Sequence, residues 1–199
     1  MKDPQSDRSQ NKIGTIAGVA ISIAVIAGGA TWWMMSSRSD RPVPDVSPTP
    51  TESPVTVQTT VEIYWVGGDT QIEFIPTPVT LEAGSDRPEA VLTAAFERLL
   101  WGPQQPDRFS EIPPGTQLLN LATTPDGAIV VDLSPEFTQG GGSASMIGRL
   151  GQVVYTATSL NPDAPVRISV NGEPLNVLGG EGLEVPQPVT RQQFEREFQ

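Results

Sequence analysis

The feature that constrains this chain most is an uncharged apolar run from Ile13 to Met35. Its length, about 23 residues, exceeds the roughly 20 that an α-helix needs to cross the hydrocarbon core of a bilayer. Trp32 and Trp33 stand at its C-terminal end, and indole rings favour the headgroup region. Because no amphipathic pattern interrupts the run, we predict a transmembrane helix rather than a buried core helix.

The charges that flank the run predict its orientation. Three basic residues precede it and two follow it, and the more basic flank tends to stay in the cytoplasm. We therefore expect residues 1–12 inside and the rest of the chain outside. The alternative is a signal peptide cut after Gly28–Ala30, but such peptides have an apolar region of only about 7–15 residues. An uncleaved signal anchor is our prediction, and cleavage stays open.

Residues 36–57 form a second, different segment. Proline, serine and threonine dominate it, and it has no apolar period. Such a stretch cannot bury enough surface to offset the entropy of ordering it, and repeated proline favours an extended spacer. We predict a disordered linker that holds residues 58–199 away from the membrane.

The composition of residues 58–199 excludes several classes of function. They contain seven arginines, no lysine and eighteen acidic residues. A surface this acidic repels phosphate backbones, so we expect no nucleic-acid partner. The whole chain has no cysteine and no histidine. Disulfides, thiolate zinc sites, lipidated cysteine and the usual neutral-pH general base are therefore excluded.

Periodicity predicts an α+β domain over residues 58–199. The expected order is β-β-α-β-β-α-β-β, a mostly antiparallel sheet with two helices packed on one face. A short terminal helix is expected in addition, capped by Thr190 and Gln193. The expected strands are 60–66, 71–79, 117–123, 128–133, 165–170 and 173–177, and the expected helices are 86–101, 143–160 and 190–198.

Local signals define the ends of these elements. Asp86 and Ser143 are the expected N-caps of the two long helices. Pro125–Gly127 and Asn171–Gly172 predict hairpin turns. Prolines within residues 71–79 predict that the end of that strand is an edge or irregular. Leu119 and Leu121 are expected to face the helices together, and Gly140–Gly142 to form a flexible loop.

Five segments of the domain together resemble a known family, the sporulation and germination GerMN domain family. They occur in the family's order and cover essentially the whole domain. The segments are Phe96–Pro103, Ile112–Leu119, Gly127–Ser134, Gln152–Thr158 and Val166–Gly172.

The resemblance implies a protein of the bacterial cell envelope, with a fold akin to ring-building motifs and no known catalysis. Together with the predicted anchor, it leads us to expect an envelope protein or a second copy of the chain as partner, and a location at the bacterial cytoplasmic membrane with the domain outside. The named sporulation member has two such domains and is usually a lipoprotein. This chain has room for one domain and has no cysteine to lipidate. The resemblance supplies no catalytic residues.

Acidic residues near the central hairpin are the first candidates for chemistry. Two carboxylates such as Asp132 and Glu136 could do acid–base work if their surroundings separated their pKa values. The alternative is that these carboxylates, with Asp126, stabilise turns. We favour the turn role. No calcium-loop or P-loop spacing is present, so we predict no metal, no cofactor and no enzyme activity.

Aromatic residues are the second candidates. Tyr64, Trp65 and Trp101 could line a groove for a glycan, with core packing as the alternative. Two functional hypotheses follow from these candidates. The first is a non-catalytic interaction module in an envelope assembly. The second is a peptidoglycan or glycan binder, or a weak cell-wall hydrolase, that uses the aromatic residues with Asp132 or Glu136.

Overall fold

The computed structural model describes residues 57–67, 72–180 and 182–199. The predicted membrane span and nearly all of the predicted linker lie outside these residues. Within them, no helix is both long enough and apolar enough to cross a bilayer. The first strand begins at Val57, the last residue of the predicted linker.

The described elements form an α+β fold, as predicted. The strands are β1 (Val57–Gly67), β2 (Glu73–Ala83), β3 (Leu118–Thr123), β4 (Ile129–Leu133), β5 (Val166–Val170), β6 (Glu173–Pro174), β7 (Val177–Leu178) and β8 (Leu183–Glu184). The helices are α1 (Pro88–Trp101), the 3-10 turn η1 (Pro135–Thr138), α2 (Ser143–Ala157) and α3 (Arg191–Phe198).

The strands do not form the single sheet that the sequence predicts. β1 and β2 make a separate antiparallel hairpin, β3-β4-β5-β6 make a four-stranded sheet, and β7 and β8 make a small ribbon. Within the four-stranded sheet, β4 and β5 run parallel. The reason is that η1 and α2 lie between them in the chain, so the chain crosses over before it rejoins the sheet.

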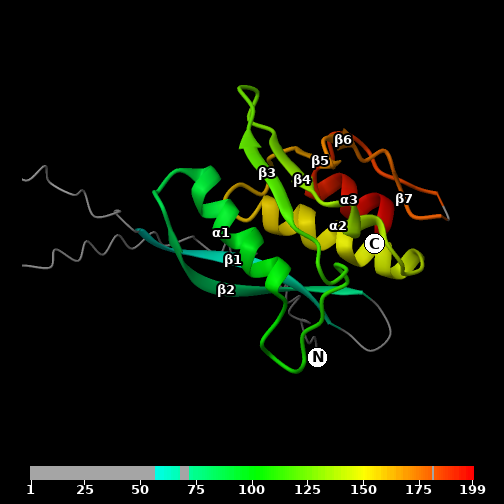
Figure 1. The fold of residues 1–199 in the computed structure, drawn as a ribbon, viewed down its shortest axis with the longest axis horizontal. Helices are drawn as coiled ribbons and strands as arrows, with labels where there is room; N and C mark the ends of the chain where they lie inside the picture. Colours follow the sequence, from blue (N-terminus) through cyan, green and yellow to red (C-terminus); the bar gives the residue numbers. More distant parts are fainter. Residues whose placement is uncertain (1–56, 68–71, 181) are drawn as a thin grey trace, which may run out of the picture.

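The helices lie between two β layers and not on one face of a sheet. Figure 1 shows α1 and α2 with the β1–β2 hairpin on one side and β3 and β4 on the other. α1 contacts β1, β2 and β3, α2 contacts β1, and α3 packs against α2. Because α2 is enclosed, every residue from Gly148 to Ala157 is buried. The main apolar core therefore joins the hairpin, the helices and the sheet, and a smaller cluster of Val61, Ala83, Val91 and Ala95 lies between α1 and the hairpin.

Two turn predictions are confirmed. Gly127 has φ +81° in the turn between β3 and β4. Asn171 and Gly172 both have positive φ, 53° and 82°, which is the type I′ geometry that joins two antiparallel strands. The short strand β6 is reached through this turn, although it ends at Pro174 and not at residue 177.

The predicted facing of Leu119 is wrong because of a β-bulge. The register between β3 and β4 shifts between Leu118 and Asn120, which leaves Leu119 as an extra residue. Leu118 and Leu121 therefore pack against the core, and Leu119 is 46% exposed. An inserted residue reverses the alternation of side chains, and simple period-2 reasoning does not detect it.

The predicted caps of the long helices are also wrong. Arg87, not Asp86, is the N-cap of α1, and Pro88 occupies the first turn. Gly142, not Ser143, is the N-cap of α2. The predicted cap of the terminal helix is confirmed, since the Thr190 hydroxyl accepts a hydrogen bond from the Gln193 amide at 3.2 Å.

Candidate functional site

Tyr64 and Trp65, two of the candidate interaction residues, belong to the core. Their exposed fractions are 7% and 0%. Tyr64 stacks on Tyr155 of α2 with ring centroids 5.0 Å apart, and the Arg191 guanidinium lies 5.0 Å from the centroid of each ring. Burial raises the pKa of both tyrosines. These residues hold α2 and α3 on the hairpin, so the packing alternative is the one that the structure supports for them.

Trp101, the third aromatic candidate, is exposed. It ends α1 with 76% of its surface accessible, the largest value among the bulky apolar side chains described. The Arg98 guanidinium lies 5.5 Å from the ring centroids of both Trp65 and Trp101. Arg98 also donates to the carbonyl of Gly102, which fixes its position. The structure thus holds one indole outside the core, with a cation between it and the buried tryptophan.

The acidic candidates each stabilise a turn. The carboxylate of Asp132 accepts a hydrogen bond from the Gly172 amide at 2.9 Å, which ties the β5–β6 turn to β4. Glu136 accepts from the Ser134 hydroxyl, and this bond holds the pKa of Glu136 below its ordinary value. Ser134 in turn accepts from the Gln117 amide at 2.9 Å. The carboxylates therefore face separate partners, and no acid–base pair is formed from them.

Asp126, the remaining carboxylate near the hairpin, pairs with Arg167 at 3.1 Å on the surface. The Thr124 hydroxyl and then the Arg167 guanidinium hold the pKa of Asp126 below its ordinary value. Among the residues that the structure describes, no three acidic side chains gather as metal ligands. The aromatic and acidic candidates do not assemble into one groove.

Polar residues inside α2 are the feature that the sequence analysis missed. Gln152 donates to the Tyr64 carbonyl at 3.2 Å and accepts from the Glu111 amide at 2.8 Å. Thr156, one turn later, accepts from the Tyr64 amide at 3.3 Å. The outward-facing amide and carbonyl of Tyr64 in β1 are thus satisfied by helix side chains. The signal in the sequence was the i, i+4 spacing of these polar residues beside the apolar stripe of α2.

Arg149 is a second polar residue that the sequence did not reveal. It is 2% exposed, and its guanidinium donates at 2.8–3.0 Å to the carbonyls of Phe137, Gln139 and Gly140. Burial lowers its pKa. A Cβ on Gly141 would lie 2.6 Å from this guanidinium. The glycine segment that was predicted to be a flexible loop is therefore fastened to α2.

The Germane family, described as sporulation and spore germination, matches residues 62–176, more than half of the chain. The chain belongs to this family. A search of curated proteins found no match.

Two solved structures share the fold of this Germane domain. The first GerMN domain of the sporulation protein GerM from Bacillus subtilis has 21% identity and a TM-score of 0.52, over 67% of this chain and 98% of that one. The tandem GerMN domains of the same protein have 20% identity and a TM-score of 0.53, over 67% of this chain. The chain matches 46% of the tandem structure, about half its length. At these identities the likeness shows the fold alone.

Proposed function

We propose that this Germane protein is a membrane-anchored, extracytoplasmic interaction module of a bacterial cell-envelope assembly, and that it acts without catalysis. The apolar run of residues 13–35 and the proline-rich spacer support an anchor. The matched family is described as sporulation and spore germination, and the resemblance to GerMN domains supports an envelope setting. The polar groups that chemistry would need are used instead to hold the fold, as in the contacts of Asp132, Glu136 and Arg149.

The observation that carries the interaction role is Trp101. A tryptophan with three quarters of its surface in water is costly, and such residues anchor protein interfaces when a partner covers them. Arg98 holds the indole from one side, so little side-chain entropy is lost when a partner packs on the other.

Site-specific crosslinking tests this role. The full-length chain is produced in its native membrane with a photoreactive benzoyl-phenylalanine at position 101, and a matched control carries it at Asp163, an exposed turn residue. We expect discrete adducts from position 101 and none from position 163. Equal adducts from both positions, or none from either, would contradict the proposal.

The glycan-binding alternative keeps one supporting residue, because Trp101 is the exposed member of the predicted aromatic groove. Sedimentation of the full-length chain with purified peptidoglycan separates the two functions. The interaction role predicts that wild type and W101A stay equally in the supernatant. If wild type pelleted, and W101A did not, the glycan role would replace the proposed one.

A further inference from the structure

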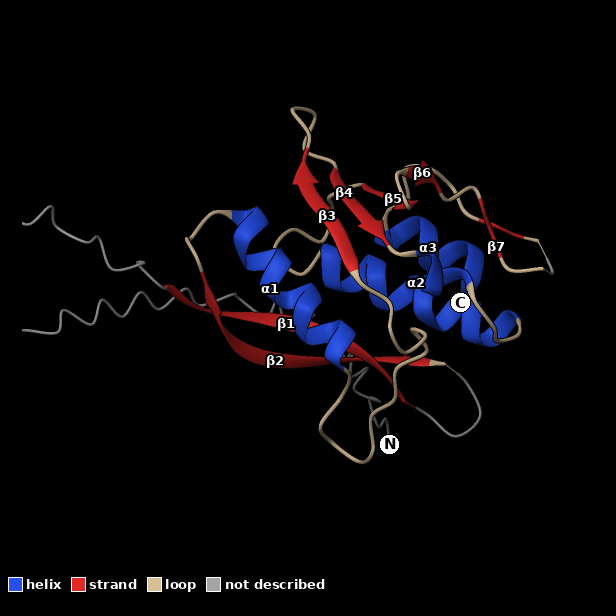
Figure 2. Cartoon of the chain, in the orientation of Figure 1, coloured by secondary structure: helices blue, strands red, loops and turns tan. Residues whose placement is uncertain are grey.

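A groove of about 480 Å³ lies between α1 and β3. Thr93, Glu97 and Leu100 line it from the helix, and residues 116–121 line it from the strand and the turn before it. Figure 2 shows α1 running alongside β3. The groove is therefore bounded by a helix on one side and by a strand of the main sheet on the other.

The strand that borders this groove is an edge strand with free backbone groups. β3 is the outermost strand in the order β3-β4-β5-β6. The Thr124 amide donates to the Ala128 carbonyl, so the alternation of an antiparallel ladder turns the N–H and C=O of Leu121 and Thr123 away from β4. Across the described residues, no backbone hydrogen bond joins β3 to α1. On this side, neither Leu121 nor Thr123 has a backbone hydrogen-bond partner within the described part of the chain.

Leucine side chains make the apolar part of the groove. Leu100, Leu118 and Leu121 line it while partly buried against the core. The bulge adds Leu119, which is 46% exposed. An extended segment that paired with β3 would therefore bury apolar surface as well as satisfy backbone groups.

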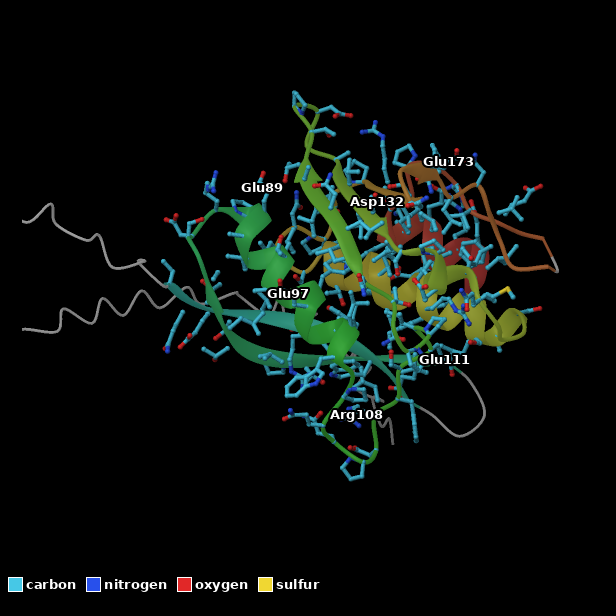
Figure 3. All side chains as sticks on the ribbon, viewed as in Figure 1. Glu89, Glu97, Arg108, Glu111, Asp132 and Glu173 are labelled. Atoms are coloured by element: carbon cyan, nitrogen blue, oxygen red, sulfur yellow. The ribbon has the colours of Figure 1, made fainter. Side chains whose placement is uncertain are left out.

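The charge of the groove is negative. Glu97 lines it, and Glu89 lies two turns earlier on α1 (Figure 3). The backbone amide of Glu89 and then the Thr123 hydroxyl hold the pKa of Glu89 below its ordinary value, so it is ionised at neutral pH. None of the residues that line the groove is basic.

We propose that this groove binds an extended, lysine- or arginine-bearing segment of another protein, which adds to β3 as a further strand. Strand addition in a groove between a sheet edge and a helix gains affinity from the backbone and specificity from the side chains. The acidic side chains of α1 select basic residues in the segment. The inference rests on the proposed function, because it gives the partner of the interaction module its chemistry.

The chain's own segments are poor occupants of the groove. Pro76 and Pro78 oppose Tyr64 and Glu62 in β2. Since the amide of Tyr64 points away from β2, the missing donors of both prolines lie on the outer edge of β2, which weakens it as a partner strand. The linker carries five prolines between residues 42 and 54, which likewise lack donors. Pairing of β3 with β3 of a second copy would bring four glutamates together.

A peptide titration tests the proposal on the full-length chain in lipid nanodiscs. The probe is a fluorescent six-residue peptide of alternating lysine and valine, and binding is followed by fluorescence anisotropy. We expect saturable binding that weakens about tenfold or more when every second amide is N-methylated, because each methyl group removes a donor from the ladder. The E97Q variant should bind several-fold more weakly, and the control E184Q, exposed on β8, should bind as wild type does.

Charge reversal supplies an independent arm. E97K should bind the lysine peptide least and should gain affinity for the matching glutamate–valine peptide. Binding that ignores N-methylation, or that is equal in E97Q, E97K and wild type, would overturn the proposal, as would no binding. If adducts still form at position 101 when the peptide fails to bind, the groove inference is wrong and the proposed function stands. If neither occurs, both are wrong.

Discussion

At the scale of single residues, the buried polar side chains of α2 decide how the hairpin is held. Without hydrogen-bond partners, the amide and carbonyl of Tyr64 would be buried against α2 unsatisfied, and unsatisfied buried groups are costly. Gln152 and Thr156 avoid that cost by hydrogen bonding to the carbonyl and amide of Tyr64 on one side of β1. Further along the same strand, Val66 pairs with Phe109. The helix thus contributes hydrogen bonds that a partner strand supplies in an ordinary sheet.

Replacement of Gln152 tests this role. The Q152A variant leaves the Tyr64 carbonyl and the Glu111 amide without their partner, so we expect the free energy of unfolding to fall by about 2 kcal/mol or more. The measurement is urea denaturation of the full-length chain in detergent, followed by tryptophan fluorescence. The matched control is Q192A at an exposed position of α3, for which we expect a change within about 0.5 kcal/mol. Equal effects would show that the Gln152 contacts contribute nothing.

The tyrosine pair gives a pH signature at the same scale. The chain has only two tyrosines, Tyr64 and Tyr155, and burial raises the pKa of each above the ordinary 10.0. A raised pKa means that the folded state holds the proton more tightly than the unfolded state does. The stabilisation is therefore complete below pH 10 and is lost as the pH rises through the folded pKa values.

We accordingly expect tyrosinate absorbance of the native chain to remain low at pH 10 and to rise only at higher pH, together with unfolding. The urea-unfolded chain should titrate near the ordinary value. The Y155F variant should keep one titrating group and lose stability less steeply above pH 10. A native chain that titrates at the ordinary pKa would contradict the burial of this pair.

At the scale of elements, close packing places the helices between the two β layers. A Cβ on Gly151 would overlap the ring of Phe74 and lie 2.8 Å from Phe194, so α2 approaches the hairpin and α3 as closely as only glycine allows. A Cβ on Gly148 meets the Glu111 side chain, which is flexible and partly exposed. The two glycines of α2 therefore differ, because close packing requires glycine at position 151 and does not require it at position 148.

A pair of alanine variants tests this difference between the two positions. Alanine favours a helix by about 1 kcal/mol over glycine, so G148A should be neutral or slightly stabilising once Glu111 moves aside. G151A should cost about 1–3 kcal/mol because the Phe194 ring that the new Cβ would meet is fully buried and cannot move aside. Urea denaturation of both variants against wild type measures the difference. Equal stability of the two variants would refute the close packing of α2.

Sequence reasoning predicted the elements better than their assembly. The turns at Gly127 and Asn171–Gly172 depend on the residue types within each turn, so both hairpins were predictable. The parallel pairing of β4 with β5, the bulge at Leu119 and the burial of Arg149 depend on contacts between distant segments. For the candidate site, the exposure of Trp101 could not be told from the burial of Trp65, because both are apolar residues near the ends of regular elements.

At the scale of the whole molecule, the chain has two parts of different character. The described residues from Val57 onward bury a main core and a smaller second cluster, and display Trp101 and the α1–β3 groove on the surface. The anchor and spacer ahead of them are predictions from sequence alone. The central claim, that the Germane domain is displayed outside the cytoplasm on a tether, depends on how the two parts lie relative to the membrane.

Labelling with a membrane-impermeant maleimide tests that claim most directly, since the chain has no cysteine of its own. One variant carries a single cysteine at the exposed turn, D163C, and the other carries it ahead of the predicted span, S6C. We expect D163C to be labelled fully in intact cells whose cell wall admits the reagent, and S6C to be labelled only after lysis. Protection of D163C until lysis, or labelling of both residues in intact cells, would contradict that claim.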